Sequence, residues 1–86
     1  MSDTQPAAFL ALFAKYGARM TLEDIGTVLR INKNDATHLV HKRLLVPLGN
    51  PKRNSVKWFC TYTIAELIQQ EDWLGKVVRA CQANHA

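Results

Sequence analysis

The stretch of sequence that decides the fold is RINKNDATHLVHKRLLVPLGNPKRNSVK, residues 30–57. Asn32, near its start, is a residue type that caps helices, so we expect a helix over residues 33–42. Residues 44–46 are an apolar run that predicts a short strand, and a loop rich in proline, glycine and asparagine follows. Residues 56–62 have the alternation of a strand and are expected to return beside the first, which makes a hairpin.

Positive charge is concentrated in this stretch. It holds seven of the 11 lysines and arginines and one of the seven acidic residues, so its net charge is +6. The rest of the chain carries four basic and six acidic residues, a net −2, and the two parts sum to +4. A basic helix beside a basic hairpin matches the shape and charge of duplex DNA. A solvated surface that keeps the chain soluble is the competing interpretation.

The expected helix over residues 33–42 has one apolar and one polar face. Ala36, Leu39 and Val40 lie together on a helical wheel and face the core, while Asp35 suits the helix N-terminus. Asparagine pairs with adenine and threonine contacts a thymine methyl group or a phosphate, so four residues are candidates for base contacts: Asn34, Thr37, His38 and His41. Candidates for contacts to the DNA backbone are Arg30, Lys33, Lys42, Arg43, Lys52, Arg53, Asn54 and Lys57.

Two helices are expected before this stretch. The first covers residues 6–16 and has a wide apolar face at helical spacing. Residues 19–20 are expected to be a brief extended link, and the second helix covers residues 22–29. Thr21, followed three residues later by Asp24, is a variant capping box. Because a turn of about three residues separates the second helix from the next, the pair predicts a helix-turn-helix.

Two more helices are expected after the hairpin. Thr63 and Glu66 have the spacing of a capping box, which predicts a helix over residues 64–70. Asp72 is expected to cap a last helix that begins at Trp73, and residues 82–86 are expected to fray. The apolar stripe of this last helix belongs either to the core or to a contact between copies of the chain.

The composition indicates one domain that spans residues 1–86, mainly α with a small β-hairpin. Hydrophobic residues make up 48% of the chain, which argues against disorder. Two cysteines are too few for a disulfide-built scaffold, and no apolar stretch is long enough to span a bilayer. We therefore expect a cytoplasmic protein without membrane contact, and neither a cofactor nor a metal ion.

Residues 20–74 share a series of residue classes with one family. The series is the opening MTLED, the helix entered from Asn32, the strand LLVP, a basic hairpin tip, the aromatic strand KWF and the helix TIAEL that ends in DWL. In these features the chain resembles the small winged helix-turn-helix of phage excisionases and the related MerR-type DNA-binding domains. It departs from the family at Arg43, where a glycine often follows the second helix of the motif. The helix over residues 6–16 and the extension after Trp73 are additions to the minimal module.

The resemblance implies a mode of action and partners. In the family, the second helix of the motif enters the major groove and the wing reaches the adjacent backbone or minor groove. Excisionases bend DNA and direct a tyrosine integrase towards excision, and several act as transcriptional regulators. One such domain covers few base pairs, so we expect a homodimer or a cooperative row on double-stranded DNA in a bacterial host.

Two other classes of function remain as alternatives. A winged helix can serve as a protein-interaction module, and the very apolar first helix favours this interpretation, whereas the concentrated +6 charge argues against it. An enzyme is the least favoured class. The sequence has no nucleophile with a base, no phosphate-binding glycine loop and no paired carboxylates in a plausible pocket.

Overall fold

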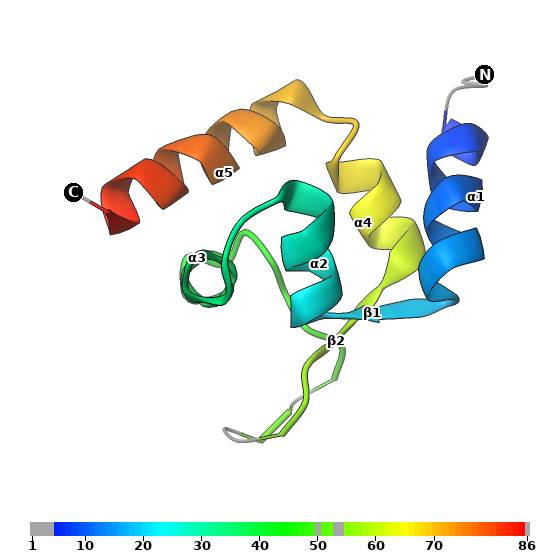
Figure 1. The fold of residues 1–86 in the computed structure, drawn as a ribbon, viewed down its shortest axis with the longest axis horizontal. Helices are drawn as coiled ribbons and strands as arrows, with labels where there is room; N and C mark the ends of the chain where they lie inside the picture. Colours follow the sequence, from blue (N-terminus) through cyan, green and yellow to red (C-terminus); the bar gives the residue numbers. More distant parts are fainter. Residues whose placement is uncertain (1–4, 50, 53–54, 86) are drawn as a thin grey trace.

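The computed structural model describes residues 5–49, 51–52 and 55–85. Within these ranges the fold is mainly helical, with five helices around one two-stranded antiparallel sheet (Figure 1). In chain order the elements are α1 (Gln5–Tyr16), β1 (Arg19–Thr21), α2 (Leu22–Leu29), α3 (Lys33–His41), β2 (Trp58–Cys60), α4 (Thr61–Leu67) and α5 (Glu71–Asn84). No helix of the described part is long and apolar enough to cross a membrane.

Both α2 and α3 begin where their capping residues predict. The hydroxyl of Thr21 accepts the backbone N–H of Asp24 at 3.1 Å, and the carboxylate of Asp24 accepts the N–H of Thr21 at 3.0 Å. This reciprocal pair confirms the capping box. The side chain of Asn32 accepts the N–H of Asp35 at 2.8 Å and caps α3. Local side-chain chemistry therefore fixes both helix starts.

The turn between α2 and α3 closes tightly against α2. Arg30 adopts a left-handed backbone with φ 59°, and the N–H of Ile31 donates to the carbonyl of Gly26 at 2.9 Å. A Cβ atom on residue 26 would lie 3.1 Å from the carbonyl oxygen of Ile31. The glycine inside α2 thus leaves room for the turn to fold back over the helix.

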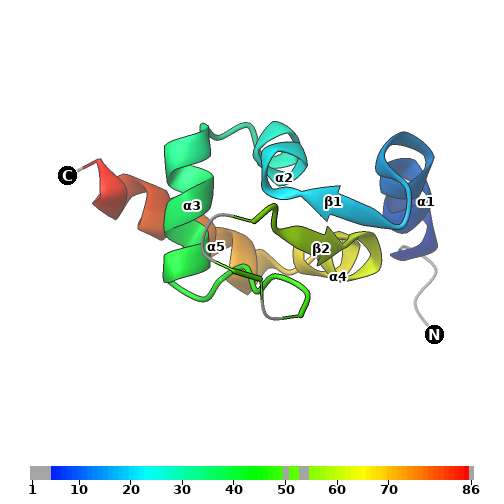
Figure 2. The same ribbon diagram turned by 90° about the horizontal axis from the view of Figure 1, so that it is seen from below.

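The expected hairpin is wrong in its first strand. β2 pairs instead with β1, with Met20 opposite Phe59, so the link over residues 19–20 is part of the sheet (Figure 2). Residues 44–46 form no strand, because the N–H groups of Leu44 and Leu45 donate back to the carbonyl of Leu39 at 3.0 and 3.3 Å. Donors engaged at the end of α3 cannot form a strand ladder.

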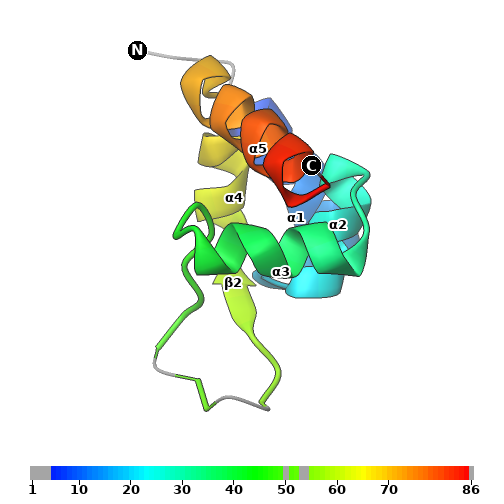
Figure 3. The same cartoon turned by 90° about the vertical axis from the view of Figure 1, so that its left-hand side faces the viewer.

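Between α3 and β2 the described residues (42–49, 51–52 and 55–57) form no helix or strand, and we name this segment the connecting loop (residues 42–57). A backbone hydrogen bond from the N–H of Leu48 to the carbonyl of Trp58, at 2.8 Å, joins the outgoing arm of the loop to the start of β2. The loop projects from the body of the molecule below α3 and β2 (Figures 1 and 3).

The starts of the last two helices also differ from expectation. α4 begins at Thr61, so Thr63 lies inside the helix and the predicted capping box does not form. The hydroxyl of Thr61 is fully buried and donates to the carbonyl of Gly17 at 2.7 Å, which binds the start of α4 to the end of α1. α5 begins before Asp72, at Glu71, and remains helical to Asn84, so the predicted fraying is wrong through residue 84.

The core draws one or more buried side chains from the sheet and from every helix except α1. Its members are Met20, Ile25, Leu39, Leu45, Phe59, Ile64, Trp73 and Val77. α1 packs against α4 and contributes only partly buried side chains such as Leu12 and Tyr16. The core is thus complete without α1, which lies at its edge (Figure 1).

The buried hydroxyl of Thr61 offers a test of how α1 is attached. Thr61→Val keeps the shape but leaves the carbonyl of Gly17 without its donor, so we expect a loss of about 1 kcal/mol in unfolding free energy. Thr63→Val, at an exposed position of the same helix, is the matched control and should change stability by much less. Urea denaturation measures both variants, and equal losses would show that the buried hydrogen bond has no special role.

Candidate nucleic-acid interface

A groove separates the outer face of α3 from the return arm of the connecting loop, and we name it the α3–loop groove. α3 contributes Lys33 and Thr37, and the loop contributes Ser55, Val56 and Lys57. The junction of β1 and α2 contributes the remaining lining residues: Thr21, Leu22 and Glu23. The groove therefore brings together two residues predicted to contact the DNA backbone, Lys33 and Lys57, and one predicted to contact a base, Thr37.

A second depression adjoins this groove on the side of α2. Arg30 and Lys33 line it together with Glu23, Thr27 and the backbone of the turn. Because Lys33 borders both depressions, Arg30 belongs to the same surface as the α3–loop groove.

The four predicted base-contact residues do not all share one environment. Asn34 and His41 are exposed on α3, and Thr37 is half-buried within the α3–loop groove. His38 differs, because its Nε2 atom is buried and has no hydrogen-bond partner among the described residues. It lies three residues after Asp35, which places the two on the same side of the helix. The polar residues of α3 therefore do not form one exposed face, because Asn34 and His41 are exposed whereas the Nε2 atom of His38 is buried.

The other predicted backbone contacts are spread around the connecting loop. Lys42, Arg43 and Lys52 are exposed. Arg43 lines a different groove, beneath α4 and α5, where Trp73 and Lys76 also lie. Arg53 and Asn54, at the expected tip, fall outside the described residues.

The basic side chains of this surface have no acidic partner. In the described part of the chain, the only ion pair within 4.0 Å joins His85 to Asp35. Glu23 borders the basic depressions without forming an ion pair with Arg30 or Lys33. Unpaired cations on one surface keep their full charge for an anionic partner.

Arg19 is a further cation that the sequence did not single out. Its guanidinium lies 3.9 Å from the ring centroid of Trp58, on the face of the sheet opposite the buried pair Met20 and Phe59. Such cation–π contacts contribute about 0.5–1 kcal/mol at exposed sites. The alternation of buried and exposed residues would reveal this neighbour only if the pairing of β1 with β2 were already known.

Two arginines adopt a backbone conformation that favours glycine. Arg30 has φ 59° and Arg43 has φ 64°. The left-handed region costs a residue with a Cβ atom about 1 kcal/mol or more relative to glycine. Arg43 occupies the position at which the resembled family often has glycine. At both positions the backbone therefore carries a cost that glycine would not have.

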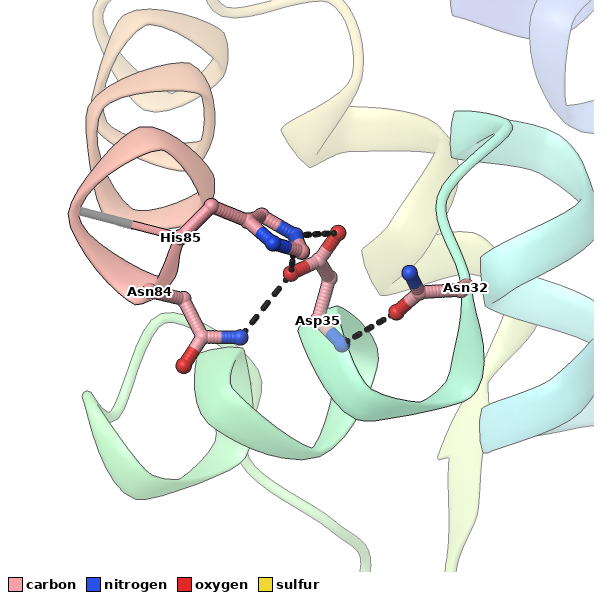
Figure 4. Close-up of polar contacts among 4 residues, drawn as sticks. All are labelled: Asn32, Asp35, Asn84 and His85. Carbon is pink, nitrogen blue, oxygen red and sulfur yellow. Dashed lines mark hydrogen bonds and ion pairs between the residues drawn. The ribbon is translucent and has the colours of Figure 1, made fainter.

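Asp35, in the first turn of α3, is buried on the side of the helix that faces α5 (Figure 4). Its carboxylate accepts Nδ2–H of Asn84 at 2.9 Å, and Nε2 of His85 lies 2.8 Å from Oδ1 and 3.1 Å from Oδ2. The hydrogen bond from Asn84, followed by that with His85, holds the pKa of Asp35 below its ordinary value, although burial acts in the opposite direction.

The described residues contain no group of three or more His, Cys, Asp or Glu side chains that could hold a metal ion. Both cysteines are free thiols. A hydrogen bond from the backbone N–H of Thr63 lowers the pKa of Cys60, and burial raises the pKa of Cys81. Neither thiol lies in the α3–loop groove.

The lowered pKa of Asp35 predicts how stability depends on pH. A carboxylate with a depressed pKa in the folded state stabilises the fold above its unfolded pKa, about 3.9, and loses this contribution as pH falls through the folded value. The unfolding free energy of the unmodified chain should therefore fall more steeply below pH 4 than that of Asp35→Asn. Denaturation at a series of pH values measures both curves, and parallel curves would contradict the assignment.

Comparison with known proteins does not identify this surface. No family model, curated protein or solved structure matches the chain.

Proposed function

We propose that this chain is a winged helix-turn-helix protein that binds double-stranded DNA, with α3 as its recognition helix and the connecting loop as its wing. The observation that carries the proposal is the α3–loop groove. Lys33 of α3 and Lys57 of the loop face the same space, and neither has a carboxylate within 4.0 Å among the described residues. A helix and a projecting loop that share a basic groove suit the alternating ridges and grooves of a duplex.

The dimensions and chemistry of α3 suit the major groove. An α-helix with its side chains is about 10–12 Å across, and the major groove, about 12 Å wide, admits it. The nine residues of α3 extend over about 13 Å. Contacts from Arg30, Lys33 and Lys57 to phosphates would fix the orientation of the protein, while exposed Asn34 and His41 would contact base edges. Thr37, inside the α3–loop groove, is placed to contact a thymine methyl group or a phosphate.

The biological role that we propose follows from the resemblance to excisionases. The protein would act as a recombination directionality factor that bends DNA and directs a tyrosine integrase to excision, as a transcriptional regulator, or as both. A single domain of this size buries less surface on DNA than specific complexes commonly do, which favours a dimer or a cooperative row. The setting is the cytoplasm of a bacterium that carries the corresponding phage or mobile element.

A protein-interaction role is the second candidate, and one observation favours it. α1 exposes large apolar side chains, with Leu10 60% and Phe13 46% accessible, and Tyr62 of α4 lies near them against Phe9. This apolar surface is built on α1 and α4 and shares no residue with the α3–loop groove.

The salt dependence of binding tests the DNA proposal directly. The unmodified chain should bind a mixed-sequence duplex with an affinity that falls linearly in log–log form as salt is raised. Lys57→Ala should flatten this slope by about one unit. Lys15→Ala removes an exposed lysine from α1, away from the groove, and should leave the slope unchanged. Fluorescence anisotropy measures all three. Absence of binding at low salt, or the same change in both variants, would refute the proposal.

Substitutions at Arg30 separate DNA binding from folding. Arg30→Gly removes the charge and relieves the left-handed backbone, so it should raise the unfolding free energy by about 1 kcal/mol while weakening DNA binding. Arg30→Ala removes the same charge but keeps the strain, so it should weaken DNA binding equally without the gain in stability. Urea denaturation and anisotropy titrations measure the two effects. Unchanged DNA affinity in both variants would exclude Arg30 from the interface.

A further inference from the structure

α5 holds α3 near both of its ends. Just beyond the C-terminus of α3, the indole Nε1–H of Trp73 donates to the carbonyl of Leu44 at 3.0 Å. In the first turn of α3, Asp35 is held by Asn84 and His85, from the other end of α5 (Figure 4). α5 therefore crosses over α3 and is bonded to its first turn and to the chain just beyond its C-terminus (Figure 3).

These contacts join segments far apart in the chain. Trp73 and Leu44 are 29 residues apart, and Asp35 is 49 residues from Asn84. The local cap of α3, Asn32, accepts only the backbone N–H of Asp35 and leaves its carboxylate without a partner. The hydrogen bonds to that carboxylate therefore come from α5 and the residue after it. The orientation of α3 thus depends on a helix that lies outside the helix-turn-helix.

The two attachments differ in kind. Trp73 is 7% exposed and belongs to the hydrophobic core, so its hydrogen bond is part of the permanent packing. The side chain of His85 is 57% exposed, and it contacts Asp35 at the surface. We name the hydrogen bonds of Asn84 and His85 with Asp35 the latch. The latch lies at the end of α3 that presents Lys33 and Asn34, both exposed, to solvent.

The latch also controls the one acidic residue of α3. With Asn84 and His85 in place, the carboxylate of Asp35 is buried and faces α5 instead of the α3–loop groove. Without them the carboxylate would lose the hydrogen bonds that fix its direction, and the first turn of α3 would lose its polar contacts with α5.

We propose that α5 is a splint for the recognition helix, and that Asn84 and His85 are positioning residues that set the angle of α3 on DNA without touching DNA. The inference rests on the proposed function. Base contacts require side chains placed within fractions of an ångström, whereas phosphate contacts tolerate larger displacements. Release of the latch should therefore reduce discrimination between DNA sequences more than it reduces total affinity.

The test compares binding to two duplexes. One is selected from a random-sequence library by the unmodified chain, and the other is a scrambled duplex of the same composition. Asn84→Ala combined with His85→Ala should bind the scrambled duplex within about twofold of the unmodified chain and the selected duplex about tenfold more weakly, a loss within the range for one mismatched base pair. Hydrogen exchange should accelerate in the first turns of α3 while the β1–β2 amides stay protected.

Two control variants separate positioning from general stability. His85→Gln, with Asn84 intact, retains a donor for Asp35 and should preserve the discrimination. Gln82→Ala changes an exposed residue of α5 outside the latch and should have no effect. Equal weakening on both duplexes, or unchanged discrimination in the double variant, would overturn the inference while leaving DNA binding established. Failure of the unmodified chain to bind any duplex would overturn the proposed function and this inference together.

Discussion

The pairing of β1 with β2 is the constraint on which the rest of the structure depends. It places Met20 beside Phe59 on the core side of the sheet, and both residues are almost fully buried. Each strand leads directly into a helix, since Thr21 ends β1 and caps α2, while Cys60 ends β2 and precedes α4. The same pairing brings the end of the connecting loop beside the start of α2, and hence beside α3. A sheet of six residues thus positions both walls of the proposed DNA-binding groove.

Charge and stability conflict on this surface. Unpaired lysines and arginines repel one another, and two arginines occupy left-handed positions where glycine would be more stable. A chain of 86 residues has a small core and little stability in reserve. The hydrogen bonds made by Thr61, Trp73 and Asp35 join elements distant in sequence and offset part of this cost. If the proposed function holds, an anionic duplex on this surface would relieve the repulsion.

The sequence predicts those features that depend on neighbouring residues. The caps at Thr21 and Asn32 define α2 and α3 to within a residue, because each signal and its effect lie within one helical turn. The strand pairing escapes prediction, because three residues of β1 are too few to show alternation and their partner is far away. The capping signal at Thr63 fails for a related reason, since the buried hydrogen bond of Thr61 starts α4 earlier.

The exposure of residues on α3 was predicted correctly only in part, because it also depends on elements that are distant in sequence. Polarity alone places Asn34, His38 and His41 on one outward face, yet only Asn34 and His41 are exposed, since the buried Nε2 of His38 lies on the Asp35 side of the helix. The residues of α3 alone do not predict that α5 covers that side of the helix.

The arrangement of the two ends of the molecule reconciles the two candidate functions. α1 and α3 lie on opposite sides of the sheet and α2 (Figure 2). α1 adds no fully buried side chain in its described part, so its exposed Leu10 and Phe13 are not required by the core. A protein partner on α1 and a duplex on α3 would occupy separate faces. α1 is attached to the rest of the fold through the hydrogen bond of Thr61 and through the sheet, and not through α3. DNA binding and protein contact are therefore compatible in one small domain, as a protein that directs another factor on DNA requires.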